Sequence, residues 1–209
     1  MSSLEIFETL EQGSEEWRRL RAGLPTASEF KNIMAVSAER TMRTDYMRRL
    51  AAEILTGEPI EGFSGNNDTK RGHEQEDSAR RGYCFITDAE VKQIGFARDL
   101  EKGAGASPDG LIGDDGGLEI KSMRADLLVG VIDADVFPST HYWQVMGNMW
   151  ITGRRWWDIA IYAPKMRLFT KRLERDPEKC AALAKEVRLF NSETAALVAR
   201  IRSYGGGAT

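Results

Sequence analysis

Three residues in the stretch SPDGLIGDDGGLEIKS, from Ser107 to Ser122, have the side chains and the spacing that metal-assisted hydrolysis of a phosphodiester needs. Asp109 lies in a Pro-Asp-Gly turn, and Glu119 and Lys121 stand two residues apart, so that their side chains share one face of a strand. The turn GDDGG is short enough for the strand of Glu119 to fold back beside Asp109. The sequence therefore predicts that two carboxylates converge next to an amine.

Two convergent carboxylates repel each other, and a hard divalent cation between them would stabilise the pair. Mg²⁺ is the natural occupant because it takes few protein carboxylates and keeps waters that a phosphate can displace, and Mn²⁺ is a candidate substitute. Lys121 could then hold or activate the attacking water. Two less specific interpretations stay open: Asp109 could bond only within its own turn, and Glu119 with Lys121 could form an exposed ion pair. The pattern of Pro-Asp, a spacer and Glu-x-Lys is typical of nucleases, but it also recurs by chance.

The elements that must position these residues change from helices to strands and back. Periodicity and turn residues predict this order along the chain: a helical segment over residues 13–36, a helix over 42–55, a loop over 60–68, a polar helix over 69–83, strands over 91–99, 110–114 and 117–122, a helix over 139–152, strands from 156 and from 168, and a helix from 176 to about 204. This order predicts an α/β fold with a mixed central sheet. The polar helix carries Glu76, and the helix over 139–152 carries Gln144.

A second candidate site lies near the N-terminus. The residues Thr26, Ala27, Ser28 and Glu29 match a capping box, which predicts that a helix begins at Thr26. Free N–H groups and the positive end of the helix dipole would make that helix start an anion site, to which Arg21 could add a bidentate fork. Ser28 could also be present for capping alone.

The composition is that of an ordinary globular protein and excludes a disordered chain. Of 209 residues, 42% are hydrophobic and 29% are charged, with a formal net charge of −3. We expect one domain over residues 1–209, a reducing compartment because only two cysteines are present, and a cytoplasmic location because no stretch could span a bilayer. Basic pairs such as Arg154 and Arg155 are, taken singly, more typical of a solvated face than of a binding site.

Four stretches, in this order, resemble the lambda exonuclease family of phage recombination nucleases, also described as YqaJ-like. They are WRRLRAGLPTASEF from Trp17, GHEQEDSAR from Gly72, SPDGLIGDDGGLEIKS from Ser107 and WQVMGNMWITGRRWWDIAIYAP from Trp143. The resemblance implies a restriction-endonuclease-like PD-(D/E)xK core, a mixed central sheet flanked by helices. It also implies a metal-dependent exonuclease that degrades one strand of linear double-stranded DNA from its 5′ end and leaves 3′ overhangs for recombination by strand annealing.

The resemblance also implies a role for each catalytic residue. Asp109, Glu119 and the backbone carbonyl of Ile120 would be metal ligands, and Lys121 would act on the water. Two metal ions would then stabilise the attacking and leaving oxygens of an in-line displacement.

The remaining residues complete the implied site. Glu76 would support the second metal or its waters, and Gln144 would close the motif. Arg21 and Ser28, with the helix start at Thr26, match the family's pocket for a 5′-phosphate, so an N-terminal helical region would bind the DNA end.

The resemblance further implies a homotrimeric ring around DNA and a single-strand annealing protein as partner. One departure concerns strand separation: the family's best-known member has an apolar wedge where this chain has the polar residues 67–70. Two alternatives stay open. One is a site-specific endonuclease of the same fold, although no segment for base readout in the major groove is evident. The other is a DNA-end-binding module without catalysis, which the intact Asp109, Glu119 and Lys121 disfavour.

Overall fold

The computed structural model describes residues 3–35, 40–60 and 66–204, with the side chains of residues 40 and 66–74 left outside the description. A five-stranded sheet in the order β2-β5-β6-β7-β8 forms its centre. Strands β6 and β7 run parallel, whereas the other neighbours run antiparallel, so the predicted mixed central sheet is confirmed. The strands of this sheet are β2 (Val91–Lys92), β5 (Gly110–Ile112), β6 (Gly116–Ser122), β7 (Trp156–Tyr162) and β8 (Phe169–Glu174).

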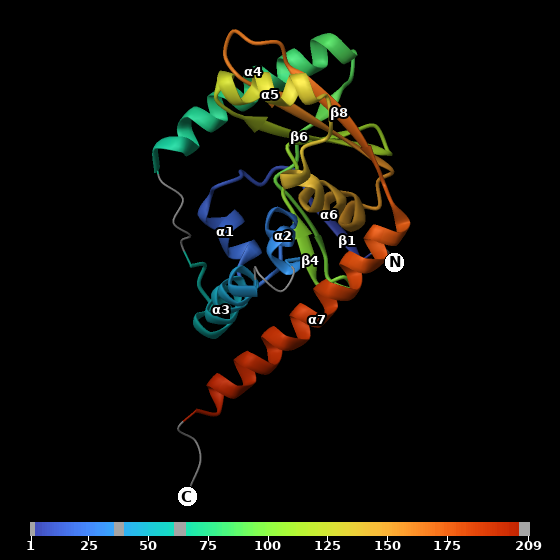
Figure 1. Cartoon of the computed structure of the whole chain (residues 1–209). Coiled ribbons are helices and arrows are strands. Elements are labelled where there is room, and N and C mark those ends of the chain that lie inside the picture. Colours follow the sequence, from blue (N-terminus) through green and yellow to red (C-terminus); the bar gives the residue numbers. More distant parts are fainter. Residues whose placement is uncertain (1–2, 36–39, 61–65, 205–209) are drawn as a thin grey trace, which may run out of the picture.

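Helices cover both faces of this sheet. Tyr83 of α4 packs on Leu118 and Ile120 of β6, while Leu128 of α5 packs on Ile159 of β7, whose side chain points to the opposite face. Figure 1 shows α4 and α5 at the top of the view, α1, α2 and α3 below them, and α7 running to the lower end. The helices are α1 (Glu15–Arg21), α2 (Phe30–Ile33), α3 (Arg40–Thr56), α4 (Asn66–Thr87), α5 (Ala125–Ala134), α6 (Tyr142–Thr152) and α7 (Pro177–Arg202).

The prediction of one strand over residues 91–99 is wrong. The segment divides into β2 and β3 (Phe96–Asp99), and β3 joins a second, antiparallel sheet in the order β1-β3-β4. Gly95 stands at the division, where its N–H donates to the carbonyl of Phe7 at 2.9 Å and an added Cβ would overlap the carbonyl of Leu10. The other two strands of this sheet, β1 (Leu4–Phe7) and β4 (Ala104–Ala106), are not in the sequence-based prediction.

Helix α5 is also absent from the prediction, because its apolar residues are not confined to one face. Leu128 is buried, but Leu127, Val129 and Ile132 are exposed on the same helix. The helical period is therefore obscured in the sequence ADLLVGVIDA.

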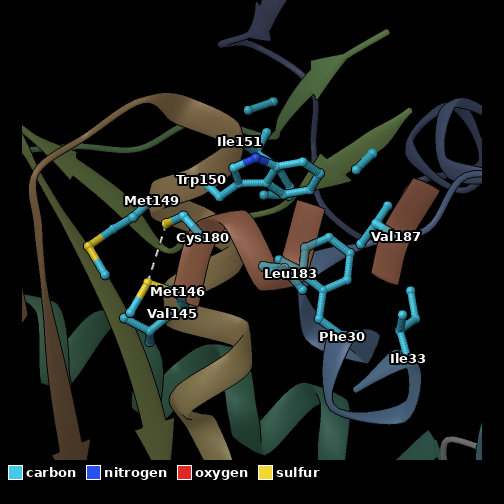
Figure 2. Close-up of a cluster of buried hydrophobic side chains, with 14 of the residues drawn as sticks. Phe30, Ile33, Val145, Met146, Met149, Trp150, Ile151, Cys180, Leu183 and Val187 are labelled. Carbon is cyan, nitrogen blue, oxygen red and sulfur yellow. Dashed lines mark hydrogen bonds between the residues drawn. The ribbon is translucent and has the colours of Figure 1, made fainter. Parts of the chain in front are cut away.

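Helix α6 packs in the centre of the main hydrophobic core, between α2 and α7. Figure 2 shows Met146 and Trp150 of α6 among side chains from both neighbouring helices, including Phe30 and Leu183. Gly147 allows the close approach, because an added Cβ there would overlap the ring of Phe30. This packing fixes α6, which carries Gln144, against the N-terminal segment that carries Ser28.

The terminal helix α7 begins where the sequence predicts. The side chain of Asp176 accepts hydrogen bonds from the backbone N–H groups of Glu178, at 2.9 Å, and Lys179, at 3.0 Å. In the described ranges, no helix is both long and apolar enough to cross a membrane.

Arg154 is a structural residue of the hairpin between β5 and β6. Its guanidinium donates to the backbone carbonyls of Ile112, Gly113 and Gly116 at 3.2, 2.8 and 2.6 Å. Arg155, which is exposed, pairs with Asp115 at 3.4 Å. Arg154 therefore holds the turn between Asp109 and Glu119, whereas Arg155 is the exposed member of this basic pair.

Candidate active site

The hairpin of β5 and β6 brings Asp109 and Glu119 together. Its register pairs Gly110 with Leu118, which places Asp109 opposite Glu119 one residue further along. One oxygen of Asp109 accepts a hydrogen bond from the backbone N–H of Ile120 at 2.6 Å. The carboxylate of Asp109 therefore crosses to the neighbouring strand and does not only bond within its own turn.

The two carboxylates lie close enough to disturb each other. Burial raises the pKa of Asp109 well above its usual range, and the charge of Glu119 raises that pKa further. The positive charge of Lys121 opposes both effects but does not cancel them. Because a negative charge on Asp109 is unfavourable beside Glu119, a bound cation would stabilise the two ionised carboxylates.

Glu119 is a buried carboxylate with three hydrogen-bond donors. Its side chain is only 2% exposed, so the interpretation of Glu119 and Lys121 as an exposed surface pair is wrong. Oε1 accepts from Lys121 at 2.7 Å and from Gln144 at 2.5 Å, while Oε2 accepts from Asn148 at 3.0 Å. A buried charge of this kind is stable only when donors surround it.

Asn148 is absent from the sequence-based site, although a signal for it exists. It follows Gln144 by four residues on α6, and residues four apart lie on one face of a helix. The sequence WQVMGNMW therefore places two amide side chains, Gln144 and Asn148, on the same face of the helix, and this spacing is the signal for Asn148.

Lys121 is a cation in this arrangement. Burial by itself would lower its pKa, but the negative charges of Glu119 and Asp109 outweigh that effect and raise the pKa above its ordinary value. A protonated Lys121 can donate hydrogen bonds to a water or a phosphate oxygen, and it cannot take a proton while it stays in this state.

Glu76 approaches the same group from α4. Its negative charge raises the pKa of Asp109 and that of Lys121, so it lies within electrostatic range of both. Arg80, one turn later and buried, forms ion pairs with Glu76 and with Asp77. Arg80 therefore holds the Glu76 carboxylate at the edge of the site.

The donor set fits a metal ion that keeps much of its water. Within the described residues, no three His, Cys, Asp or Glu side chains gather closely enough to hold an ion by themselves. The carboxylates of Asp109 and Glu119 present hard oxygen atoms, and Asp109 lies against the backbone N–H of Ile120. Mg²⁺ is usually bound by one or two carboxylates together with waters, so this set suits it better than a structural zinc ion.

A second polar cluster surrounds Arg21. Its guanidinium donates to Ser107 Oγ at 3.3 Å and to Thr26 Oγ1 at 3.2 Å, and it stacks on the ring of Trp17 at 3.8 Å. The hydroxyl of Ser28, which is exposed, lies 3.4 Å from that of Thr26. The structure thus brings the three predicted pocket residues together, and adds Ser107 and Trp17, which the sequence-based assignment lacks.

The negative charges of Glu29 and Glu53 lie within electrostatic range of Arg21 and act to raise its pKa. Among the described residues, none of the carboxylates forms an ion pair with its guanidinium. Burial lowers the pKa of Arg21 to about 10, which still leaves it protonated at neutral pH. The cluster therefore combines a half-buried cation with neighbouring hydroxyl groups, which are the kinds of donor that an anion accepts hydrogen bonds from.

The predicted capping box does not form. The backbone N–H of Thr26 donates to the hydroxyl of Tyr46 at 2.9 Å, and the Glu29 carboxylate accepts from Asn32 and Arg49 and does not reach back. Thr26 makes no side-chain capping bond; a 3-10 turn, η1 (Ala27–Glu29), follows it and leads into α2, which has four residues. Because the helix dipole of so short a segment is small, the positive charge of this cluster comes from Arg21 and not from the start of a helix.

Ser107 links the two clusters. Its hydroxyl accepts hydrogen bonds from Arg21 and from Trp17 Nε1, the latter at 3.0 Å, and it precedes Asp109 by two residues. The polar cluster around Arg21 and the pair of carboxylates are therefore joined by one short segment of backbone. The polar side chains of residues 67–70, at the expected position of a wedge, lie outside the described side chains.

Comparisons with known proteins identify the family and the fold of this chain. A model of the YqaJ-like viral recombinase domain matches residues 16–155. An alkaline exonuclease from Laribacter hongkongensis, LHK-Exo, is 31% identical over 92% of this chain and 98% of that one, with a TM-score of 0.82, and its structure in complex with dAMP gives the same values. The fold class, a PD-(D/E)xK nuclease core, is thereby confirmed.

A more distant solved structure shows the fold alone. A phage-related exonuclease from Haemophilus somnus 129PT is 15% identical over 88% of this chain and 99% of that one, with a TM-score of 0.62. A search of the curated proteins found no match.

Proposed function

Because this chain belongs to the YqaJ-like viral recombinase domain family and is a DNA exonuclease, we propose that it degrades one strand of linear double-stranded DNA from the 5′ end. Digestion in this direction would leave 3′ single-stranded overhangs for recombination by strand annealing. The observation that carries the proposal is the hydrogen bond from Arg21 to Ser107, two residues before Asp109. It joins an anion site to a carboxylate pair, as an enzyme that starts from a terminal phosphate requires.

Nucleases of this family use divalent metal ions, and the ion proposed here is Mg²⁺, with Mn²⁺ as a substitute. Asp109, Glu119 and the backbone carbonyl of Ile120 would hold it. Two such ions would stabilise the charge on the attacking and leaving oxygens of the phosphodiester. The raised pKa of Asp109, which results from burial and then from the charge of Glu119, supports this assignment.

Each remaining residue of the cluster has a role that follows from its contacts. Lys121, protonated and 2.7 Å from Glu119, would orient the attacking water or a phosphate oxygen. Gln144 donates to the same Glu119 oxygen as Lys121, so it would fix that carboxylate. Glu76, held by Arg80, would add negative charge near the second ion.

The 5′-phosphate would bind at Arg21, Thr26 and Ser28, with Ser107 as a fourth contact. Arg21 supplies the charged donor, and the hydroxyl groups supply neutral ones. The stacking of Arg21 on Trp17 would hold the guanidinium plane in place before the phosphate binds.

Replacing Arg21 with alanine should remove the preference for phosphorylated ends. Charge-assisted hydrogen bonds are worth about 1.5–3 kcal/mol, so digestion of a 5′-phosphorylated duplex should slow by about tenfold to a hundredfold, with little change for a 5′-hydroxyl duplex. The measurement is the initial rate on the two substrates. Arg19→Ala is the matched control, because Arg19 lies on the same helix but is exposed and paired with Glu15.

A full phosphate preference in Arg21→Ala, or none in the wild-type protein, would contradict this pocket and the direction inferred from it. A site-specific endonuclease of the same fold is the alternative function. It would cut a closed circular duplex, which has no end to bind.

We also propose that the protein acts as a homotrimeric ring and delivers its product to a single-strand annealing protein. A ring would retain a chain of net charge −3 on a polyanion by topology, since bulk attraction is weak. Sedimentation should therefore give the mass of three chains, and one binding event should remove many nucleotides. A monomer that dissociates after each cleavage would contradict the ring.

A further inference from the structure

We propose that Asn148 is a positioning residue that orients Glu119 for metal binding, an inference that rests on the proposed function. Asn148 Nδ2 donates to Glu119 Oε2 at 3.0 Å, and both residues are 1% exposed. The contact lies on the side of the carboxylate away from Lys121 and Gln144, which both donate to Oε1. Asn148 therefore decides which oxygen of Glu119 is turned into the site.

The position of Asn148 is itself fixed by the fold. Its neighbours on α6, including Gly147 and Met149, are fully packed, and Gly147 lies against the ring of Phe30. The backbone carbonyl of Asn148 accepts a hydrogen bond from Thr152 Oγ1 at 2.7 Å. An amide on such a rigid helix can impose an orientation on a carboxylate that it contacts.

Hydrogen bonds to metal-ligating carboxylates tune the metal site, and their loss typically costs about tenfold to a hundredfold in metal affinity or activity. Without Asn148, Oε2 would be buried without its donor, and the carboxylate could turn toward the remaining donors on Oε1. The expected result is weaker metal binding, with the catalytic groups themselves unchanged.

Two variants separate the hydrogen bond from packing. Asn148→Ala removes the amide and leaves a cavity, whereas Asn148→Leu removes the amide and keeps the volume. The readout is the binding of Mg²⁺ and of Mn²⁺ to the DNA-free protein, measured by calorimetry and by metal-dependent thermal stabilisation. Both variants should need about tenfold to a hundredfold more metal than the wild type.

Asn32→Ala is the matched control. Asn32 also donates its amide to a carboxylate, that of Glu29 at 2.5 Å, but on α2 and outside the carboxylate cluster. The Asn32→Ala variant should bind Mg²⁺ and Mn²⁺ with the same affinity as the wild-type protein. Digestion by the Asn148 variants should recover at saturating Mg²⁺, because the group that contacts the metal is still present.

The outcomes separate this inference from the function on which it rests. Wild-type metal affinity in either Asn148 variant would overturn the positioning role, and a defect in Asn148→Ala alone would assign the residue to packing. If Asn148→Leu does not fold, Asn148→Ala compared with Asn32→Ala decides the question. Failure of the wild-type protein to bind either ion would contradict both this inference and the proposed function.

Discussion

Replacement of Asp109 by asparagine should abolish digestion of linear duplex DNA while making the metal-free protein more stable. Removal of a metal ligand should cost several kcal/mol of transition-state stabilisation, a loss of at least about a thousandfold in rate. The asparagine oxygen can still accept the hydrogen bond from the backbone N–H of Ile120, so the fold is retained. The neutral amide also removes the repulsion between the half-buried carboxylate of Asp109 and the buried carboxylate of Glu119.

Two measurements check this prediction. The rate of nucleotide release should fall to background, and the unfolding temperature in chelator should rise by about 2–4 °C for each kcal/mol of repulsion removed. Added Mg²⁺ should stabilise the wild-type protein but not the variant. Near wild-type digestion by Asp109→Asn would show that the carboxylate pair is not the active site.

Replacement of Lys121 by methionine should reduce turnover far more than DNA binding. Methionine keeps a long apolar chain but loses the ammonium group that contacts Glu119 at 2.7 Å. A charged hydrogen-bond donor that stabilises the transition state contributes about a hundredfold to a thousandfold in rate, and that contribution is made in the chemical step. The rate should fall within this range, while the affinity for duplex DNA in chelator stays nearly unchanged.

The matched control is Lys185→Met, on the exposed side of α7 and away from the carboxylates, which should change neither quantity. Single-turnover experiments give the rate of the chemical step, and binding isotherms give the affinity for duplex DNA. Equal losses of affinity and rate in Lys121→Met would instead identify Lys121 as a clamp for a DNA phosphate.

The catalytic hairpin could be predicted because its geometry is local. A short turn between Asp109 and Glu119 leaves few ways to arrange the two strands, and the observed register places these residues opposite each other. The sequence pattern places Glu76 on the polar helix and Gln144 on the helix after the strands, and the resemblance implies their roles. In the structure, Gln144 contacts Glu119, and Glu76 lies within electrostatic range of Asp109.

The parts that the sequence did not predict depend on contacts between distant segments. Gly95 turns the chain from one sheet into another because it packs under Leu10, more than eighty residues earlier. The capping box at Thr26 does not form because the hydroxyl of Tyr46, on α3, accepts the hydrogen bond from the Thr26 N–H that Glu29 would accept in a capping box. The role of Asn148 depends on a tertiary contact with Glu119, although its spacing of four residues from Gln144 already indicates the same face of the helix. In each case a tertiary contact overrides or adds to a local pattern.

The most direct test of the account is strand-resolved digestion of a 5′-phosphorylated linear duplex, labelled on either strand end, beside a closed circular duplex. With Mg²⁺, we expect mononucleotides to be released from the 5′ ends, the 3′-ending strands to persist as overhangs, and the circle to remain intact. Chelator should stop the reaction. Loss of label from the 3′ ends first, cutting of the circle, or full activity in chelator would contradict the central claim of a metal-dependent exonuclease that starts at a 5′-phosphate.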